Sequence, residues 1–415
     1  MGLDEKTVVG DLAIFGGGAL MDEPLHVGRP NIGSHCDFLG RVEAILKRGW
    51  LTNRGQCVQE FEKKVADYLG VKHCIAMCNG TVALEIAIRA LGLKGEVIVP
   101  SFTFVATAHA LQWQEITPVF CDIDPVSGTI DPDQIESMIT PRTTGIIGVH
   151  LWGRPCATEQ IARIAAKHKL EVLYDAAHAF GCSHAGKMIG NSGAAEVLSF
   201  HATKFFNTLE GGAVVTNDDA LATKVRLMKN FGFSGYDNVI YIGTNGKMNE
   251  VSAAMGLTNF AQLEEFIEVN RRNYHAYKNG LADLHGVTLF PYDESEKSNY
   301  QYIAIEADER RTGLSRDALI EILHAENVLA RRYFFPGCHR MQPYKALFPH
   351  AGLLLPNTER LAARVIMLPT GSAVQAQQVE AICELLKYAV RHADDILPRL
   401  RHRAAQAGVG AKAGV

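Results

Sequence analysis

The sequence has no long apolar run, no cysteine framework and no excess of charge of one sign. No apolar stretch reaches the ~18 residues that span a bilayer, and the first residues are acidic before they are apolar, unlike a secretory signal peptide. The nine cysteines form no CxxC pair, which argues against disulfides and against a bound metal. A net charge of −4 without Lys/Arg runs gives no sign of a nucleic-acid surface. We therefore expect a cytoplasmic protein that binds neither metal, membrane nor nucleic acid.

Short apolar runs alternate with helical patterns from about residue 60 to residue 230. Most runs are apolar throughout, which is typical of strands that are covered on both faces. Because strand and helix alternate so often, the pattern predicts an α/β domain with a mostly parallel, seven-stranded sheet. The expected strands are KHCIAMC, EVIVPSF, TPVFCDID, TGIIGVHL, LEVLYDAA, EVLSFHA and GAVVTN.

After about Asn249 long helical patterns dominate, and they indicate a smaller α+β domain hung on a long connecting helix. Its expected elements are a strand near YQYIAIEA and helices near SRDALIEILHAEN and QVEAICELLKYAVRHA. The triple glycine at Gly16 to Gly18 follows no strand and precedes no Lys-Ser/Thr, so we interpret it as part of a flexible arm rather than a phosphate loop. The expected divisions are an N-terminal arm (1–30), a large domain (31–262), a small C-terminal domain (263–400) and a disordered tail (401–415).

Two segments at the ends of expected strands could carry chemistry. Asn79, Gly80 and Thr81 lie between an apolar run and an amphipathic helix, where backbone N–H groups and the helix dipole favour a phosphate. An ordinary capped turn would have the same sequence. Asp175 ends another strand, where ligands of parallel sheets bind, and His178 follows it. A buried aspartate needs a cation or hydrogen-bond donors, and taken alone this one is better explained by a helix cap or an internal salt bridge than by a ligand.

A third segment, EVLSFHATKFFNTLEGGAVVTND, contains Ser199 at a strand end and Lys204 in the loop that follows. Most lysines are solvated surface residues. Lys204, however, stands between two apolar stretches, where desolvation would lower the pKa of its amine, as a Schiff-base lysine requires. Each segment is ambiguous alone, and only their order and spacing together are informative.

Taken together, the segments resemble the DegT/DnrJ/EryC1/StrS family of sugar aminotransferases, which has the aspartate-aminotransferase fold (fold type I) and uses pyridoxal 5′-phosphate (PLP). The resemblance covers nearly the whole chain apart from the arm and the tail. The matching segments are GRPNIG, RGWLTNRGQCVQEFEKKVADYLG, NGTVALEIAIRALGL, VIVPSFTFVATAHA, DAAHAFG, SFHATKFFNTLEGGAVVTND and PGCHRMQPY.

The resemblance implies catalytic roles for three residues. Lys204 is the lysine that bonds the cofactor and later moves the proton. Asp175 pairs with the pyridine nitrogen and keeps it protonated, so that the ring is an electron sink. His178 lies near the phenolic oxygen of the ring, and Phe104 occupies the place of the aromatic residue that stacks on it.

The resemblance also implies where the phosphate and the substrate bind. Gly80, Thr81 and Ser199 hold the phosphate. Asn245 matches an asparagine that family members donate to the neighbouring subunit's phosphate, although GTNGKMNE departs from the more usual GYNYRMSE. Thr52 and His339 match positions on the substrate side.

The implied reaction is transfer of an amino group from L-glutamate to a nucleotide-linked keto sugar, with pyridoxamine 5′-phosphate formed in between and a homodimer sharing its active sites. The segment RRYFFPGCHRMQPY is most similar to enzymes acting at C4 of dTDP-4-keto-6-deoxyglucose, which supply amino sugars for antibiotics. Alternatives are amination of a 3-keto sugar or a cyclitol, a sugar 3-dehydratase, and a PLP-binding regulatory protein. In the dehydratases a histidine replaces the lysine, so Lys204 argues against that branch. The regulatory proteins carry a DNA-binding domain, for which the arm is too short.

Overall fold

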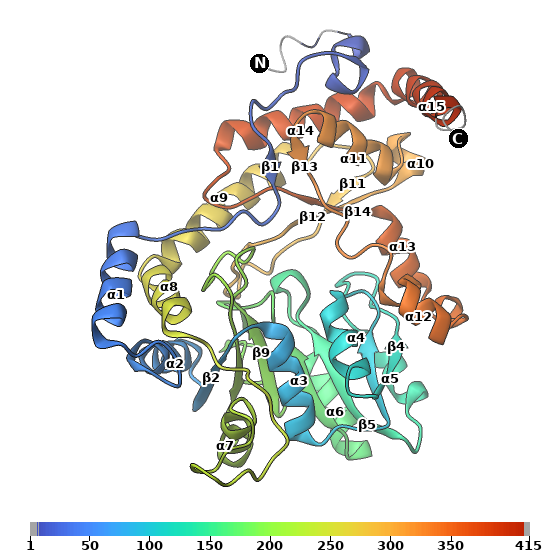
Figure 1. Ribbon diagram of the computed structural model, residues 1–415. Coiled ribbons are helices and arrows are strands. Elements are labelled where there is room, and N and C mark those ends of the chain that lie inside the picture. Colours follow the sequence, from blue (N-terminus) through green and yellow to red (C-terminus); the bar gives the residue numbers. More distant parts are fainter. Residues whose placement is uncertain (1–5, 7, 411–415) are drawn as a thin grey trace.

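The computed structural model describes Lys6 and residues 8–410 (Figure 1). Its main sheet has seven strands in the order β2 (His73–Met77), β10 (Gly212–Thr216), β9 (Ala195–Ser199), β6 (Glu171–Asp175), β5 (Thr143–Val149), β3 (Glu96–Pro100) and β4 (Thr117–Cys121). β10 is antiparallel to both of its neighbours, and the remaining pairs are parallel. The mostly parallel seven-stranded sheet is thus confirmed, and each strand begins within or one residue before its expected segment.

Helices cover both faces of this sheet, which explains why its strands are apolar throughout. One face packs on α3 (Gly80–Leu91), α4 (Val105–Gln112) and α7 (Asp219–Met228). The other packs on α2 (Gln56–Leu69), α8 (Glu250–Phe260) and α6 (Thr158–His168), with α1 (His35–Arg48) outside them and α5 (Pro132–Ile135) beside α6. Water is therefore excluded from both faces of the sheet and reaches it only where the strands end.

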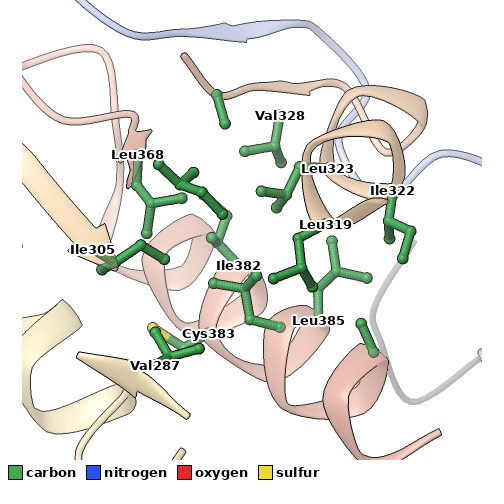
Figure 2. Close-up of a cluster of buried hydrophobic side chains, with 14 of the residues drawn as sticks. Val287, Ile305, Leu319, Ile322, Leu323, Val328, Leu368, Ile382, Cys383 and Leu385 are labelled. Atoms are coloured by element: carbon green, nitrogen blue, oxygen red, sulfur yellow. The ribbon is translucent and has the colours of Figure 1, made fainter. Parts of the chain in front are cut away.

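The smaller domain is built on a three-stranded antiparallel sheet of β11 (Val287–Leu289), β12 (Ile303–Ala307) and β14 (Val365–Leu368). Its main helices are α9 (Leu263–Gly280), α11 (Arg316–Ala325) and α14 (Ala376–Arg391), and the short helices α10 (Glu309–Thr312), α12 (Gln342–Leu347) and α13 (Pro356–Arg364) complete it. Figure 2 shows its core, where Ile305 and Leu368 of the sheet face Leu319 and Ile382 of the helices.

The expected long connecting helix is two helices. α8 ends at Phe260 and α9 begins at Leu263, with Ala261 and Gln262 as the joint. α8 is buried nearly all round, whereas α9 is amphipathic, because the first lies inside the large domain and the second leads into the small one. Among the described residues, no helix is long and apolar enough to cross a membrane.

The two ends of the chain differ from expectation. The described part of the arm packs on the small domain: Leu12, Ile14 and Leu20 are buried in its core, and β1 (Leu25–His26) pairs in parallel with β13 (Val328–Leu329). Helix α15 (Ala393–Gly410) includes residues 401–410 of the expected disordered tail, since alanine-rich sequence extends a helix readily even without an apolar stripe. Residues 411–415 lie outside the described residues.

A buried ion pair anchors the arm. Lys6 Nζ lies 3.0 Å from Glu326 Oε1, and the two side chains are only 5% and 1% exposed. The Glu326 carboxylate also accepts hydrogen bonds from the N–H groups of Ala13 and Leu20, at 2.9 and 2.7 Å. One carboxylate thus satisfies three donors of the arm.

We predict that Glu326→Ala lowers the free energy of unfolding by about 3–5 kcal/mol, because it leaves the Lys6 ammonium buried without its counter-charge and two N–H groups buried without their acceptor. Urea unfolding measures this change. The matched control is Glu384→Ala, which breaks an ion pair with Lys387 on the exposed side of α14 and is expected to cost less than about 1 kcal/mol. Equal losses in the two variants would contradict the anchoring role.

Candidate active site

A cavity of about 500 Å³ lies at the carboxyl ends of the parallel strands, where β5, β6 and β9 end at Val149, Asp175 and Ser199. This edge is the usual ligand site of parallel sheets. The cavity gathers seven of the predicted site residues: Gly80, Thr81, Phe104, Asp175, His178, Ser199 and Lys204. Val27 and Gly28 of the arm and Tyr302, Tyr333 and Phe334 from beyond α9 close its other side.

One end of the cavity is the start of helix α3. Asn79 caps the helix by accepting a hydrogen bond from the N–H of Val82 at 2.8 Å. The first two N–H groups of the helix, those of Gly80 and Thr81, have no acceptor within the helix, so they are available to an anion. A Cβ on Gly80 would lie 3.2 Å from Cβ of Ser199, and a Cβ on Gly212 would lie 2.6 Å from the Gly80 nitrogen. β10 therefore requires glycine at position 212, where it meets the turn, and the space between Gly80 and Ser199 is tight.

Asp175 is a buried carboxylate held by two donors. Its Oδ2 accepts from Thr107 Oγ1 at 2.8 Å and its Oδ1 from the N–H of Ala177 at 3.1 Å. Burial raises the pKa of Asp175, while these hydrogen bonds and the charge of Lys204 lower it. A protonated ring nitrogen is the kind of partner that would keep such a carboxylate ionised.

Lys204 lies in the loop between β9 and β10. Asn31 holds that loop. Its side-chain amide donates to the backbone carbonyl of Phe205, and its backbone carbonyl accepts from the side-chain amide of Asn207. Burial lowers the pKa of Lys204 to about 8, against the opposing charge of Asp175. The lysine thus has the desolvated, partly neutral amine that its sequence context predicts.

His178 is a buried, neutral imidazole. Its Nδ1 accepts a hydrogen bond from the N–H of Trp152 at 3.2 Å, which leaves Nε2 to carry the proton. Burial first, and the nearby Lys204 second, hold the pKa of His178 well below its usual value. The ring stacks on Phe334 at 5.7 Å between centroids. His178 therefore offers a neutral N–H donor.

Phe104 stands at the rim. It is the N-cap of α4, and its side chain is 55% exposed, which is unusual for a phenylalanine. Its ring centroid lies 6.2 Å from that of Phe334, so the two rings face the same space. An aromatic face at this place suits a flat heterocycle.

The other three predicted residues do not line the cavity. Thr52 is exposed between α1 and α2, and Asn245 is exposed beside Asn230, with which it forms a backbone bridge. His339 is buried, with Nδ1 2.7 Å from Ser101 Oγ and Nε2 2.7 Å from Glu359. Within one chain, His339 thus links Ser101 to Glu359 and does not line the cavity, and its role on the substrate side stays a prediction.

Sequence analysis missed several residues of this site. Thr107 orients Asp175 from one turn into α4, and Tyr302 reaches Lys204 from the small domain. Neither carries a sequence signal, since a threonine in an apolar helix and a tyrosine next to an apolar strand are ordinary core residues. Gly28 has a positive φ of 77° and packs on Thr203, which a sequence does not reveal either.

We predict that the Lys204 amine of the cofactor-free protein loses its proton with a midpoint near pH 8, because burial disfavours the charged form. Competitive acetylation with acetic anhydride at a series of pH values, read by mass spectrometry, measures this midpoint. Exposed Lys63 is the internal control, since its hydrogen bond to Asp67 raises its pKa above the usual value. A Lys204 midpoint as high as that of Lys63 would contradict the prediction.

The chain is similar to known aminotransferases over most of its length. Residues 34–387 match the model of the DegT/DnrJ/EryC1/StrS aminotransferase family. A dTDP-4-amino-4,6-dideoxy-D-glucose transaminase of Shigella dysenteriae is 39% identical over 369 residues, which cover 88% of this chain and 99% of that protein.

Solved structures agree with this match. DesI, determined in the presence of its TDP-sugar product, is 48% identical with a TM-score of 0.91, and the match covers 95% of this chain and all of DesI. The PLP form of Spr1654 from Streptococcus pneumoniae is 22% identical with a TM-score of 0.82, covers 89% of this chain and 99% of Spr1654, and supports the fold. The predicted fold class and family are confirmed: the chain belongs to the DegT/DnrJ/EryC1/StrS aminotransferase family.

Proposed function

We propose that this aminotransferase uses PLP to transfer an amino group from L-glutamate to C4 of dTDP-4-keto-6-deoxyglucose. The observation that carries the proposal is one cavity holding a desolvated lysine, a buried aspartate and a helix-capped anion site. The Shigella relative is named a transaminase of dTDP-4-amino-4,6-dideoxy-D-glucose, and DesI has a TDP-sugar product, which supports the nucleotide and the sugar.

The cavity fits PLP at each of its polar groups. The first turn of α3 with Gly80, Thr81 and Ser199 suits the phosphate, and Asp175 at the other side suits a protonated pyridine nitrogen. The N–H of His178 suits the phenolic oxygen. When bound, PLP supplies an electron sink that stabilises negative charge on the substrate carbon.

Three side chains of this protein would support that chemistry. Asp175 would hold a positive charge on the ring nitrogen, and Thr107 keeps Asp175 in place by its hydrogen bond. The free amine of Lys204 would take the proton from the α-carbon of glutamate in the first half of the cycle. In the second half the same amine would move protons in the reverse direction while the keto sugar is aminated.

The decisive experiment uses the purified protein with PLP, glutamate and dTDP-4-keto-6-deoxyglucose. We expect sugar-dependent formation of 2-oxoglutarate and a product whose mass matches the amino sugar, with NMR placing nitrogen at C4. We predict that Lys204→Ala abolishes this turnover and leaves the fold intact, whereas Lys63→Ala, on the surface, leaves it unchanged.

Three outcomes would overturn parts of the proposal. Turnover by Lys204→Ala would exclude the lysine as the base. Product with nitrogen at C3, or product from a cyclitol ketone alone, would replace the substrate and keep the aminotransferase. Loss of a sugar hydroxyl without transfer of nitrogen would favour the dehydratase alternative.

We further propose that two subunits share their sites, with Asn245 reaching the phosphate of the neighbour. Asn245 is exposed and lies outside the cavity of its own chain. The segment before it carries exposed apolar side chains, among them Phe231, Tyr236 and Ile242, as a surface covered by a second copy would.

A complementation test separates sharing from a contact within one chain. We predict that Asn245→Ala weakens PLP binding and that gel filtration gives a dimer. When Lys204→Ala and Asn245→Ala subunits are co-expressed, mixed dimers contain one site with both native residues, so about a quarter of wild-type activity is expected. Recovery no greater than the residual activity of Asn245→Ala would place Asn245 in its own subunit's site or in none.

A further inference from the structure

The side chain of Lys204 is contacted by a tyrosine from the other domain. Lys204 Nζ donates to Tyr302 Oη at 3.4 Å. Lys204 belongs to the large domain, whereas Tyr302 directly precedes β12 of the small one. Neither the sequence pattern nor the comparisons assign a role to this hydroxyl.

Tyr302 is held in a fixed position. Its N–H donates to Tyr292 Oη at 3.2 Å, and the same hydroxyl of Tyr292 donates to the carbonyl of Tyr302 at 3.0 Å. Its ring lies 4.7 Å from the ring of His178, measured between centroids. Only 8% of Tyr302 is exposed. A hydroxyl on so constrained a ring has little freedom to leave Lys204.

The hydroxyl of Tyr302 keeps its proton near neutral pH. Burial raises the pKa of Tyr302 well above its usual value, and the negative charge of Asp175 acts in the same direction. A neutral phenol both donates and accepts hydrogen bonds. It can therefore accept from the ammonium of Lys204 and donate to its neutral amine.

We propose that Tyr302 is a positioning residue whose hydroxyl holds the free amine of Lys204 between its two proton transfers. The inference rests on the proposed role of Lys204 as the base. While the lysine is bonded to the cofactor, the hydroxyl is not needed for its position. Once released, a lysine side chain has four rotatable bonds, and a fixed partner reduces the conformations that it samples.

The proton balance follows from the two hydrogen-bonding states. After the amine has taken the α-proton of glutamate it is an ammonium and donates to Tyr302. After it has passed that proton on it is neutral and accepts from Tyr302. The phenol keeps its own proton in both states. Tyr302 therefore changes the geometry of the transfer and adds no acid or base to it.

Tyr302→Phe tests this inference, since it keeps the ring against His178 and removes only the hydroxyl. The matched control is Tyr300→Phe, which removes the hydroxyl of another buried tyrosine from the same segment but outside the cavity. Thermal unfolding of both variants checks that the fold is unchanged.

The first readout uses the cofactor-free protein and no turnover. An ammonium ion binds a hydroxyl more strongly than a neutral amine does, so removing Tyr302 Oη should lower the pKa of Lys204 by about 0.5 to 1. Competitive acetylation of Lys204 measures this change. Tyr300→Phe should leave the midpoint where it is in the wild-type protein.

The second readout uses the loaded enzyme with glutamate deuterated at the α-carbon. We predict that Tyr302→Phe lowers kcat by about 3- to 10-fold with little change in KM, and that it increases the primary isotope effect, because proton transfer becomes slower than the other steps. An unchanged Lys204 midpoint together with an unchanged isotope effect would overturn the inference.

The two proposals fail in different ways. If the wild-type protein forms no amino sugar, the proposed function fails, yet acetylation still reports whether Tyr302 contacts Lys204. If Lys204→Ala is inactive while Tyr302→Phe matches the wild type in both readouts, the function stands and the positioning role is wrong.

Discussion

Desolvation of an amine and a carboxylate in one cavity is the constraint on which this site depends. Burial lowers the pKa of Lys204 and raises that of Asp175, so each group is moved toward its neutral form. The charge of Lys204 lowers the pKa of Asp175, and the charge of Asp175 raises the pKa of Lys204, so each charge opposes the effect of burial on the other group. That balance exists only where protein excludes water, and the covered sheet creates such a place. Its strands are apolar on both faces, and polar groups appear where the strands end.

The small domain also contributes to the burial of Lys204. It brings Tyr302, Tyr333 and Phe334 over the cavity, so the amine of Lys204 is buried by residues far away in the sequence. Asn31, the first residue after the arm, connects the two domains at the same point. Asn31 bonds the loop that carries Lys204, and its Oδ1 accepts from Ser372 Oγ of the small domain at 2.7 Å. A displacement of the small domain would therefore expose Lys204 to water and raise its pKa.

How much of this the sequence predicts depends on the range of each interaction. The seven strands are predictable because a strand covered on both faces is apolar at successive positions, a local signal. That Lys204, Asp175 and Gly80 line one cavity is predictable because their segments resemble a family. Tyr302 and Thr107 are not, because their roles arise from contacts across 98 and 68 residues of sequence. The packing of the arm on the small domain is unpredictable for the same reason, because Glu326, which holds the arm, lies more than 300 positions away.

The intermediate pKa of Lys204 suits the role proposed for it, a base that takes up a proton and later gives one up. An amine that stayed at the usual lysine value would be almost wholly protonated near neutral pH and could not take a proton from carbon. One buried without any opposing charge would be a weak base and would take up a proton poorly. Asp175 raises the pKa of Lys204 while burial lowers it to about 8, which leaves both forms populated near neutral pH. In the proposed mechanism the carboxylate that would pair with the cofactor ring is also the one that raises the pKa of the lysine, so both proposed roles involve the same buried charge.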